Sequence, residues 1–404
     1  MVNIMKNKIL VFLNDSFWSI LGLMIMNVVA QFLVYPTWAS KLGTEDYGNV
    51  LYLLSIMNII SVSIGLALNN SRIVNSINGY TLNGDYNSIL LNFCIVLLPI
   101  CGLLARFGKA DAEVIDIILY WILICITTWR YYCDIEYRLT TNYKGYFIYY
   151  IIIAAGYILG NVIFLKSGIW QLALIPGEFA GVIFVIFKGS VILPGFFKKS
   201  LEFQNVVKQF LTLVSAQLLS NLIFNLDRVV LKICFNGTAV TIYYISSLLG
   251  KTASLVTGPF NSVIIGHLSK YKGRLEKKNF VRILILLILM VILGTFCCVI
   301  GSMIIIGILY PEESKQASQY FIPANLSSIL YFASGIFTTI LLRFSKAKYQ
   351  VYINIIYTIS FIIAILFAIV TAKFQNFVYA VLAASTIRFA AAICFGITVI
   401  EKNK

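Results

Sequence analysis

Long apolar segments, each close to the length of a membrane-spanning helix, follow one another along most of this chain. A helix needs roughly 20 apolar residues to cross the hydrocarbon core of a bilayer. Hydrophobic residues make up 60% of the 404 residues and charged residues only 12%, which is more apolar surface than a soluble domain can cover. The sequence therefore predicts an all-α polytopic membrane protein with about 12 transmembrane helices in two six-helix lobes. We place these helices near residues 16–36, 48–68, 88–107, 114–132, 146–165, 169–187, 208–233, 241–263, 281–309, 320–342, 350–371 and 376–399.

The basic residues indicate which side of the membrane each loop occupies. With an even number of spans both termini lie on one side, and the loops expected there carry most of the 31 Lys and Arg residues. We assign Arg72, Arg130 and Arg138 to these loops. The positive-inside rule then predicts that both termini are cytoplasmic. This distribution explains most of the net charge of +15 without a nucleic-acid partner.

The two halves of the chain open in a similar way, which is typical of transporters built from repeats. Gly43-Thr44 follows the first apolar segment and Gly237-Thr238 follows the seventh. We therefore expect an N-terminal six-helix lobe at 1–190, a cytoplasmic linker at 191–207 and a C-terminal six-helix lobe at 208–404. The linker has two interpretations: an interfacial helix whose lysines lie among anionic head groups, or an ordinary basic loop.

Motifs of soluble enzymes are missing from the sequence. The eight cysteines form no CxxC pair, so we expect no metal or redox site. Gly250-Lys251-Thr252 resembles the end of a phosphate-binding loop, but Ile245 stands where such a loop has its first glycine. We expect no cofactor and no enzymatic activity.

Charged residues inside the apolar segments are the strongest functional signal, because burying a charge in a membrane is costly. Asp227 and Arg228 are adjacent and point about 100° apart on a helix, so they cannot share a face. Asp227 therefore needs a cation from another helix, and we expect Arg388 rather than Lys251. Glu178 lies near the middle of the sixth segment. Two alternatives stay open for both acids: structural pairing, or coupling to an ion.

Small residues recur at a spacing that brings helices close together. Gly156 and Gly160 lie four apart in the fifth segment, and Gly177 and Gly181 do so in the sixth. This pattern predicts tight packing between the two helices rather than a ligand site.

Four loose motifs are spread over the whole chain. They are Tyr35-Pro36 with Leu42-Gly43 and Tyr47-Gly48, Ile64-Gly65-Leu66 with Arg72, Asp227-Arg228 with Gly237 and Tyr243, and Pro259 with Ser269-Lys270. With these motifs the chain resembles the polysaccharide-repeat flippases (Wzx type) of the multidrug/oligosaccharidyl-lipid/polysaccharide exporter superfamily. One departure is Ile242, which stands where the family often has a glycine before the tyrosine.

The resemblance implies two six-helix lobes around a central cavity. It implies a flippase that moves a polyprenyl-diphosphate-linked oligosaccharide from the cytoplasmic to the outer leaflet of the bacterial inner membrane. The product would serve surface polysaccharide synthesis, such as O-antigen and lipopolysaccharide biosynthesis. Membrane lipids, a polysaccharide polymerase and chain-length machinery are the further partners it suggests. A glycan head group cannot cross hydrocarbon unaided, because its hydroxyl groups would lose their hydrogen bonds.

The resemblance also places the candidate substrate-binding residues in the cavity. The cations Arg72, Arg228, Lys251 and Arg388 would balance the diphosphate, with Arg72 receiving it at entry. An equally open interpretation of Arg72 is an ordinary positive-inside anchor. The polar cavity residues implied are Asn27, Gln31, Asn58, Asn69, Gln217, Asn221 and Asn225.

Two other functions compete with the flippase. A drug or cation exporter of the same superfamily would favour acidic groups in its cavity over cationic ones. A membrane polymerase or glycosyltransferase would need a sizeable outer loop with catalytic residues, whereas the predicted outer loops are short.

Overall fold

The computed structural model describes residues 17–76, 81–108, 113–254, 276–344 and 348–402. The chain divides into two compact units, Met1–Lys232 and Ile233–Lys404. This division lies inside the seventh predicted span, whereas the sequence placed the boundary at 191–207. Within the described residues the structure contains helices and no strands, so the prediction of an all-α membrane protein is confirmed.

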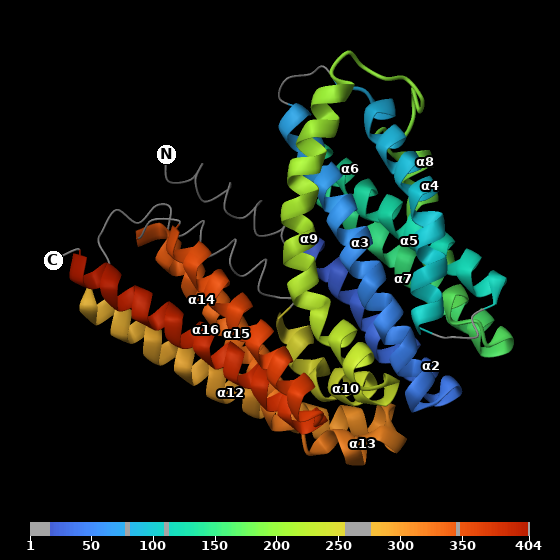
Figure 1. Ribbon diagram of the computed structural model, residues 1–404. Helices are drawn as coiled ribbons and strands as arrows, with labels where there is room; N and C mark the ends of the chain where they lie inside the picture. The colour runs from blue at the N-terminus through green and yellow to red at the C-terminus, as the bar shows by residue number, and fades with distance from the viewer. Residues whose placement is uncertain (1–16, 77–80, 109–112, 255–275, 345–347, 403–404) are drawn as a thin grey trace. The chain divides into compact units, whose positions relative to one another are not determined.

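Helices of the first unit are labelled in Figure 1. The first long helix, Phe17–Leu42, contains a π turn, η1 (Ala30–Val34), directly before α2 (Tyr35–Leu42). Such a wide turn accommodates Pro36, whose nitrogen carries no hydrogen to donate. The other helices are α3 (Thr44–Ser76), α4 (Asn83–Gly108), α5 (Val114–Cys133), α6 (Ile135–Thr140), α7 (Tyr143–Ser167), the short 3-10 helix η2 (Trp170–Ala173), α8 (Ile175–Lys188) and α9 (Phe203–Cys234).

The first unit is organised around α3 and α5. Helix α5 packs on α3, α4 and α8, and α7 packs on α8. Gly156 of α7 and Gly177 of α8 meet so closely that a Cβ atom on Gly156 would lie 2.4 Å from the Cα atom of Gly177. The predicted glycine contact between the fifth and sixth spans is therefore confirmed.

Local sequence sets several helix ends in this unit. Glu113 and Asp116 form a capping box at the start of α5, and Asn142 accepts a hydrogen bond from the Gly145 N–H at the start of α7. Gly43 and Gly168 follow α2 and α7 with φ angles of 81° and 77°, a conformation that favours glycine.

The segment Ser190–Ser200, which we call the strap, joins α8 to α9 without forming a helix. Asn83 donates to the Ser190 and Pro194 carbonyls at 2.7 and 2.9 Å. Glu136 accepts from the Ser190 and Val191 N–H groups at 2.7 and 3.1 Å. Side chains of α4 and α6 thus bind the backbone groups that a helix would pair internally. The strap therefore forms no helix, and its location at the membrane surface stays a prediction.

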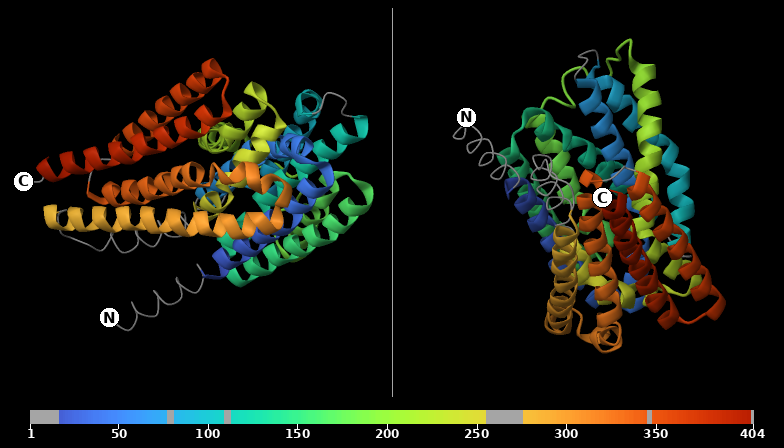
Figure 2. Two further views of the ribbon diagram at one scale, coloured as in Figure 1. Left: turned by 90° about the horizontal axis from the view of Figure 1, so that it is seen from below. Right: turned by 90° about the vertical axis from the view of Figure 1, so that its left-hand side faces the viewer.

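The second unit consists of α10 (Gly237–Ser254), α12 (Lys277–Leu309), α13 (Pro311–Ser318), α14 (Phe321–Phe344), α15 (Lys348–Thr371) and α16 (Phe374–Lys402). Helix α14 packs on α10, α12 and α16, and α15 packs on α16. The four long helices α12, α14, α15 and α16 run side by side in Figure 1 and in Figure 2. Asn325 of α14 accepts from the Gly250 N–H at 2.8 Å and donates to the Ser246 carbonyl at 3.1 Å, which ties α14 to α10.

Each predicted span overlaps a helix of the structure, although the lengths differ. Among the described residues, nine helices are long and apolar enough to cross a membrane, and α9, which bends by 47° between Leu219 and Asn221, makes a tenth. The sixth predicted span is instead η2 followed by the short α8, because Pro176 lies in the first turn of a new helix. Part of the eighth predicted span, after Ser254, lies outside the described residues.

Candidate functional site

A row of hydrogen bonds, which we call the polar ladder, joins α9 to α3 over most of their length. Gln209 accepts from the hydroxyl of Ser71 at 2.9 Å near the start of α9. Farther along, Asn221 donates to Ser63 at 3.0 Å. Beyond Asn221, Arg228 Nη1 donates to Ser55 Oγ at 3.4 Å and Lys232 Nζ donates to Asn49 Oδ1 at 2.5 Å.

The polar ladder brings together two residues that the sequence predicted, Asn221 and Arg228, with partners that it did not single out. Ser55 and Ser63 were missed because a lone serine in an apolar helix usually bonds its own backbone. The spacing of polar residues along α3 could have indicated these two serines. Polar residues recur there at intervals of six to eight positions, at Asn49, Ser55, Ser63 and Ser71.

Asn225 and Asp227 lie on the same stretch of α9 and are both buried. Asn225 donates to the Asn221 carbonyl at 3.0 Å, and Asp227 Oδ1 accepts from the Arg228 N–H at 2.9 Å. Asp227 belongs to the first unit and Arg388 to the second, so their pairing stays a prediction.

Glu178 forms a buried ion pair with Arg130. Arg130 Nε and Glu178 Oε2 are 2.7 Å apart, and each side chain is 3% exposed. The Tyr157 hydroxyl donates to the other oxygen of Glu178. The placement of Arg130 in a cytoplasmic loop is wrong: it lies inside α5. The sequence of α8 could have indicated this ion pair. Glu178 has no basic residue three or four positions away in its own helix, so it needs a cation from another helix.

Arg72 of α3 forms hydrogen bonds that connect α3 to α4, α5 and the strap. Its Nη1 donates to the hydroxyl of Tyr132 in α5 and to the Val191 carbonyl at 2.9 Å, and its Nη2 donates to Asn83 Oδ1 at 2.5 Å. The guanidinium also lies 5.1 Å from the ring centroid of Tyr86. These contacts use the planar fork of an arginine, so the geometry favours a structural role over binding of an incoming phosphate.

We expect Arg72→Lys to lower the free energy of unfolding by about 1.5–3 kcal/mol, because an ammonium group cannot reproduce several charged hydrogen bonds in this arrangement. Thermal unfolding of the purified protein in detergent measures the change. The matched control is Arg106→Lys, since Arg106 is exposed in the last turn of α4. Unchanged stability together with lost transport would restore the substrate-entry role.

The cations of the second unit have aromatic neighbours. Lys251 Nζ lies 5.2 Å from the ring centroid of Tyr243. The Arg388 guanidinium lies 3.8 Å from the centroid of Tyr331, and Arg388 donates to the Tyr331 carbonyl at 3.3 Å and to Asn354 Oδ1 at 3.4 Å. These partners of Arg388 are all neutral. They stabilise the guanidinium, but they carry no negative charge that would neutralise it.

The remaining predicted amides differ in their surroundings. Asn69 is fully buried and donates to the Tyr131 carbonyl of α5 at 2.8 Å, so it packs inside the first unit. Asn27 donates to the Leu23 carbonyl of its own helix at 2.8 Å. Gln31 lies in the π turn, and Asn58 and Gln217 are half-buried on α3 and α9.

Comparison with known proteins identifies the fold. No protein-family model and no curated protein matches the sequence. The structure resembles an inward-facing multidrug resistance MATE family transporter of the MOP superfamily, with a TM-score of 0.68 and 14% identity over 95% of this chain and 98% of that one.

Two further solved structures have the same arrangement. One is the lipid II flippase MurJ in an inward closed conformation, with a TM-score of 0.61 and 16% identity over 96% of this chain and 87% of that one. The other is a MOP superfamily transporter from Pyrococcus furiosus, with a TM-score of 0.63 and 14% identity over 97% of this chain and 95% of that one. The chain therefore has the fold of MOP superfamily transporters.

Proposed function

We propose that this protein is a flippase that moves a polyprenyl-diphosphate-linked oligosaccharide from the cytoplasmic to the outer leaflet of the bacterial inner membrane, for surface polysaccharide synthesis. Both termini lie in the cytoplasm in this proposal. Arg228, Lys251 and Arg388 compensate the diphosphate during transfer, and the amides of α9 bind the glycan. Arg72 holds the structure around them.

The observation that carries the proposal is the polar ladder with its cationic end. Arg228 and Lys232 extend from α9 toward neutral oxygen atoms of α3. Charge-assisted hydrogen bonds from such cations suit a phosphate, and they gain strength where water is excluded. The likeness to a solved lipid II flippase supports a lipid-linked substrate for the same fold.

A cation exporter would need acidic groups available to its substrate, and most buried carboxylates of the first unit are already engaged. Asp85 accepts from the Ser200 N–H at 2.7 Å, and Asp134 accepts from two tyrosine hydroxyls at 3.1 Å. Glu136 binds the strap and Glu178 pairs with Arg130. Asp227, the other buried acid of the described part of this unit, accepts from the Arg228 N–H at 2.9 Å. Because these acids all have partners within the protein, an anionic substrate is favoured over a cationic one.

We expect Arg228→Gln to slow flipping at least about tenfold, because losing one charged hydrogen bond costs about 1.5–3 kcal/mol. The assay uses proteoliposomes and a fluorescent polyprenyl-diphosphate oligosaccharide, whose transfer is read by chemical quenching from one side. Arg228→Lys should retain part of the rate. The matched control is Lys208→Gln, an exposed cation on the same helix.

Each rival predicts a different result in this assay. Extrusion of a cationic dye that depends on Asp227, without transfer of the labelled lipid, would identify an exporter. Elongation of the glycan by the purified protein would identify a glycosyltransferase or polymerase. Equal rates for Arg228→Gln and wild type would remove Arg228 from the substrate path.

A further inference from the structure

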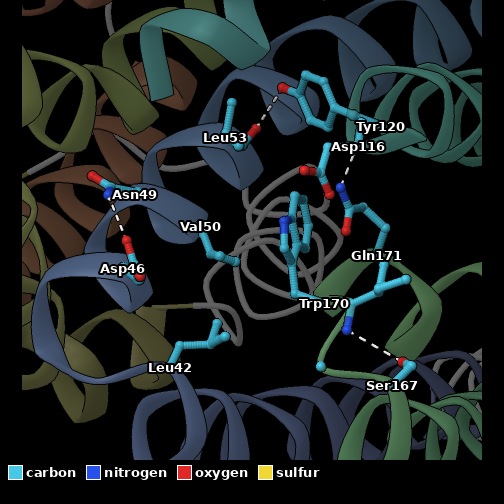
Figure 3. Close-up of a pocket in the computed structure, with 12 residues that line it drawn as sticks. Leu42, Asp46, Asn49, Val50, Leu53, Asp116, Tyr120, Ser167, Trp170 and Gln171 are labelled. Carbon is cyan, nitrogen blue, oxygen red and sulfur yellow. Dashed lines mark hydrogen bonds between the residues drawn. The ribbon is translucent and has the colours of Figure 1, made fainter. Parts of the chain in front are cut away.

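A pocket in the first unit lies where four helix ends meet, and it shares Asn49 with the polar ladder. It has a volume of about 200 Å³. Figure 3 shows its walls: the start of α3 with the end of α2 on one side, and the start of α5 with the turn from α7 into η2 on the other. In the topology proposed above, all of these ends face outward. The lining includes Asp46, Asn49, Asp116, Tyr120, Trp170 and Gln171.

The aromatic wall of this pocket is held in place by its neighbours. Trp170 is 9% exposed, and its ring lies edge-on to Trp38 with centroids 5.8 Å apart. It also contacts Tyr120 at 6.1 Å, and the Tyr120 hydroxyl donates to the Leu53 carbonyl at 2.8 Å. Tyr120 and Trp38 are fully buried and hold Trp170 in place, so the exposed part of the Trp170 ring is a preformed apolar surface for a ligand.

The polar wall offers mainly hydrogen-bond acceptors. Gln171 is 2% exposed and donates to the Asp116 carbonyl at 3.2 Å, while its Oε1 has no partner within the described residues. A buried oxygen left unpaired is unfavourable, so a ligand that donates a hydrogen bond would be stabilised there. Asp46 accepts from the Asn49 side chain at 3.2 Å, and Asp116 accepts from the Glu113 N–H at 3.3 Å. A carboxylate has about four acceptor sites, so both groups keep further acceptor capacity.

We propose that this pocket binds one sugar ring of the oligosaccharide on the outer face, an inference that rests on the proposed function. Hydroxyl groups donate to the carboxylate and amide oxygens, and the apolar face of the ring lies against the aromatic wall. The volume is below the roughly 300–1,000 Å³ of pockets for drug-sized ligands, which fits a single ring. The two carboxylates repel the diphosphate, which we place at the cationic end of the polar ladder. That end adjoins the pocket, because Lys232 donates to Asn49 at 2.5 Å.

The test uses saturation-transfer NMR on the protein in nanodiscs, with methyl glycosides of hexoses, hexosamines and hexuronic acids as probes. At least one neutral glycoside should bind, and Gln171→Met should weaken its binding more than tenfold without lowering the melting temperature. The matched control is Gln375→Met, because Gln375 is exposed at the start of α16. Equal binding by the Gln171→Met protein and wild type would overturn the assignment.

Asp116→Asn separates a sugar from a cation. It should weaken glycoside binding only a few-fold, because an asparagine oxygen still accepts hydrogen bonds. If choline binds instead, and Asp116→Asn abolishes that binding, the pocket takes cations and the inference fails. Flipping of the labelled lipid in proteoliposomes without glycoside binding would overturn this inference alone. Loss of both signals would overturn the proposed function as well.

Discussion

Glu178→Gln is expected to lower the free energy of unfolding by about 3–5 kcal/mol, because it removes one partner of a buried ion pair and leaves the other charged. Arg130 and Glu178 are each only 3% exposed at the side chain, so water cannot replace the lost carboxylate. The Tyr157 hydroxyl can still donate to a glutamine oxygen, which confines the change to the charge. Thermal unfolding in detergent measures the loss.

A double variant shows whether the charge is the cause. Arg130→Gln with Glu178→Gln leaves two neutral amides and should be more stable than Glu178→Gln alone. Glu312→Gln is the matched control, since Glu312 is exposed in the first turn of α13. If the double variant loses the sum of both single losses, the two residues do not stabilise each other.

Gly156→Leu is expected to prevent α7 and α8 from packing, with a loss beyond the roughly 1–3 kcal/mol usual for overpacked sites. A Cβ atom on Gly156 would lie 2.4 Å from the Cα atom and 2.7 Å from the backbone nitrogen of Gly177. These are backbone atoms, so no change of side-chain rotamer can relieve the clash. The yield of monodisperse protein after extraction, and its melting temperature, measure the effect.

Gly307→Leu is the matched control for this steric prediction. Gly307 lies in α12 with nothing within 4 Å of an added Cβ, so leucine should be neutral or stabilising there, given its better helix propensity. Similar losses at both positions would show that glycine matters for the helices themselves, and not for their contact.

The sequence alone predicted the contact at Gly156, but it did not predict the ion pair between Arg130 and Glu178. The glycine spacing and the spans are local patterns, because hydropathy and a four-residue interval act within one helix. The partner of Glu178 lies 48 positions away in another helix, and only the packed structure brings Arg130 to it. Local patterns therefore predicted the helices and one helix contact, whereas the ion pair depended on tertiary packing.

The candidate site shows the same limit. The sequence selected Asn221 and Arg228 as polar residues in an apolar helix, but their hydroxyl partners on α3 looked like ordinary serines. Arg72 was recognised as unusual, yet its position before a loop gave no sign of the contacts with Tyr132, Asn83 and Val191. The pocket beside Trp170 is lined by three stretches of the chain, within 42–53, 116–120 and 167–171, so no local pattern indicates it.

The hydrogen bonds of the strap limit which part of the chain can change conformation between the two units. Its backbone is hydrogen-bonded to α3, α4 and α6, and α9 is joined to α3 after it. Both segments are therefore carried as part of the first unit, which extends to Lys232. In the transport that we propose, the strap therefore does not serve as a flexible connection between the two units. We expect any change of angle between the units in that proposal to be absorbed after Lys232, over the last two residues of α9 and over Phe235 and Asn236, which precede α10.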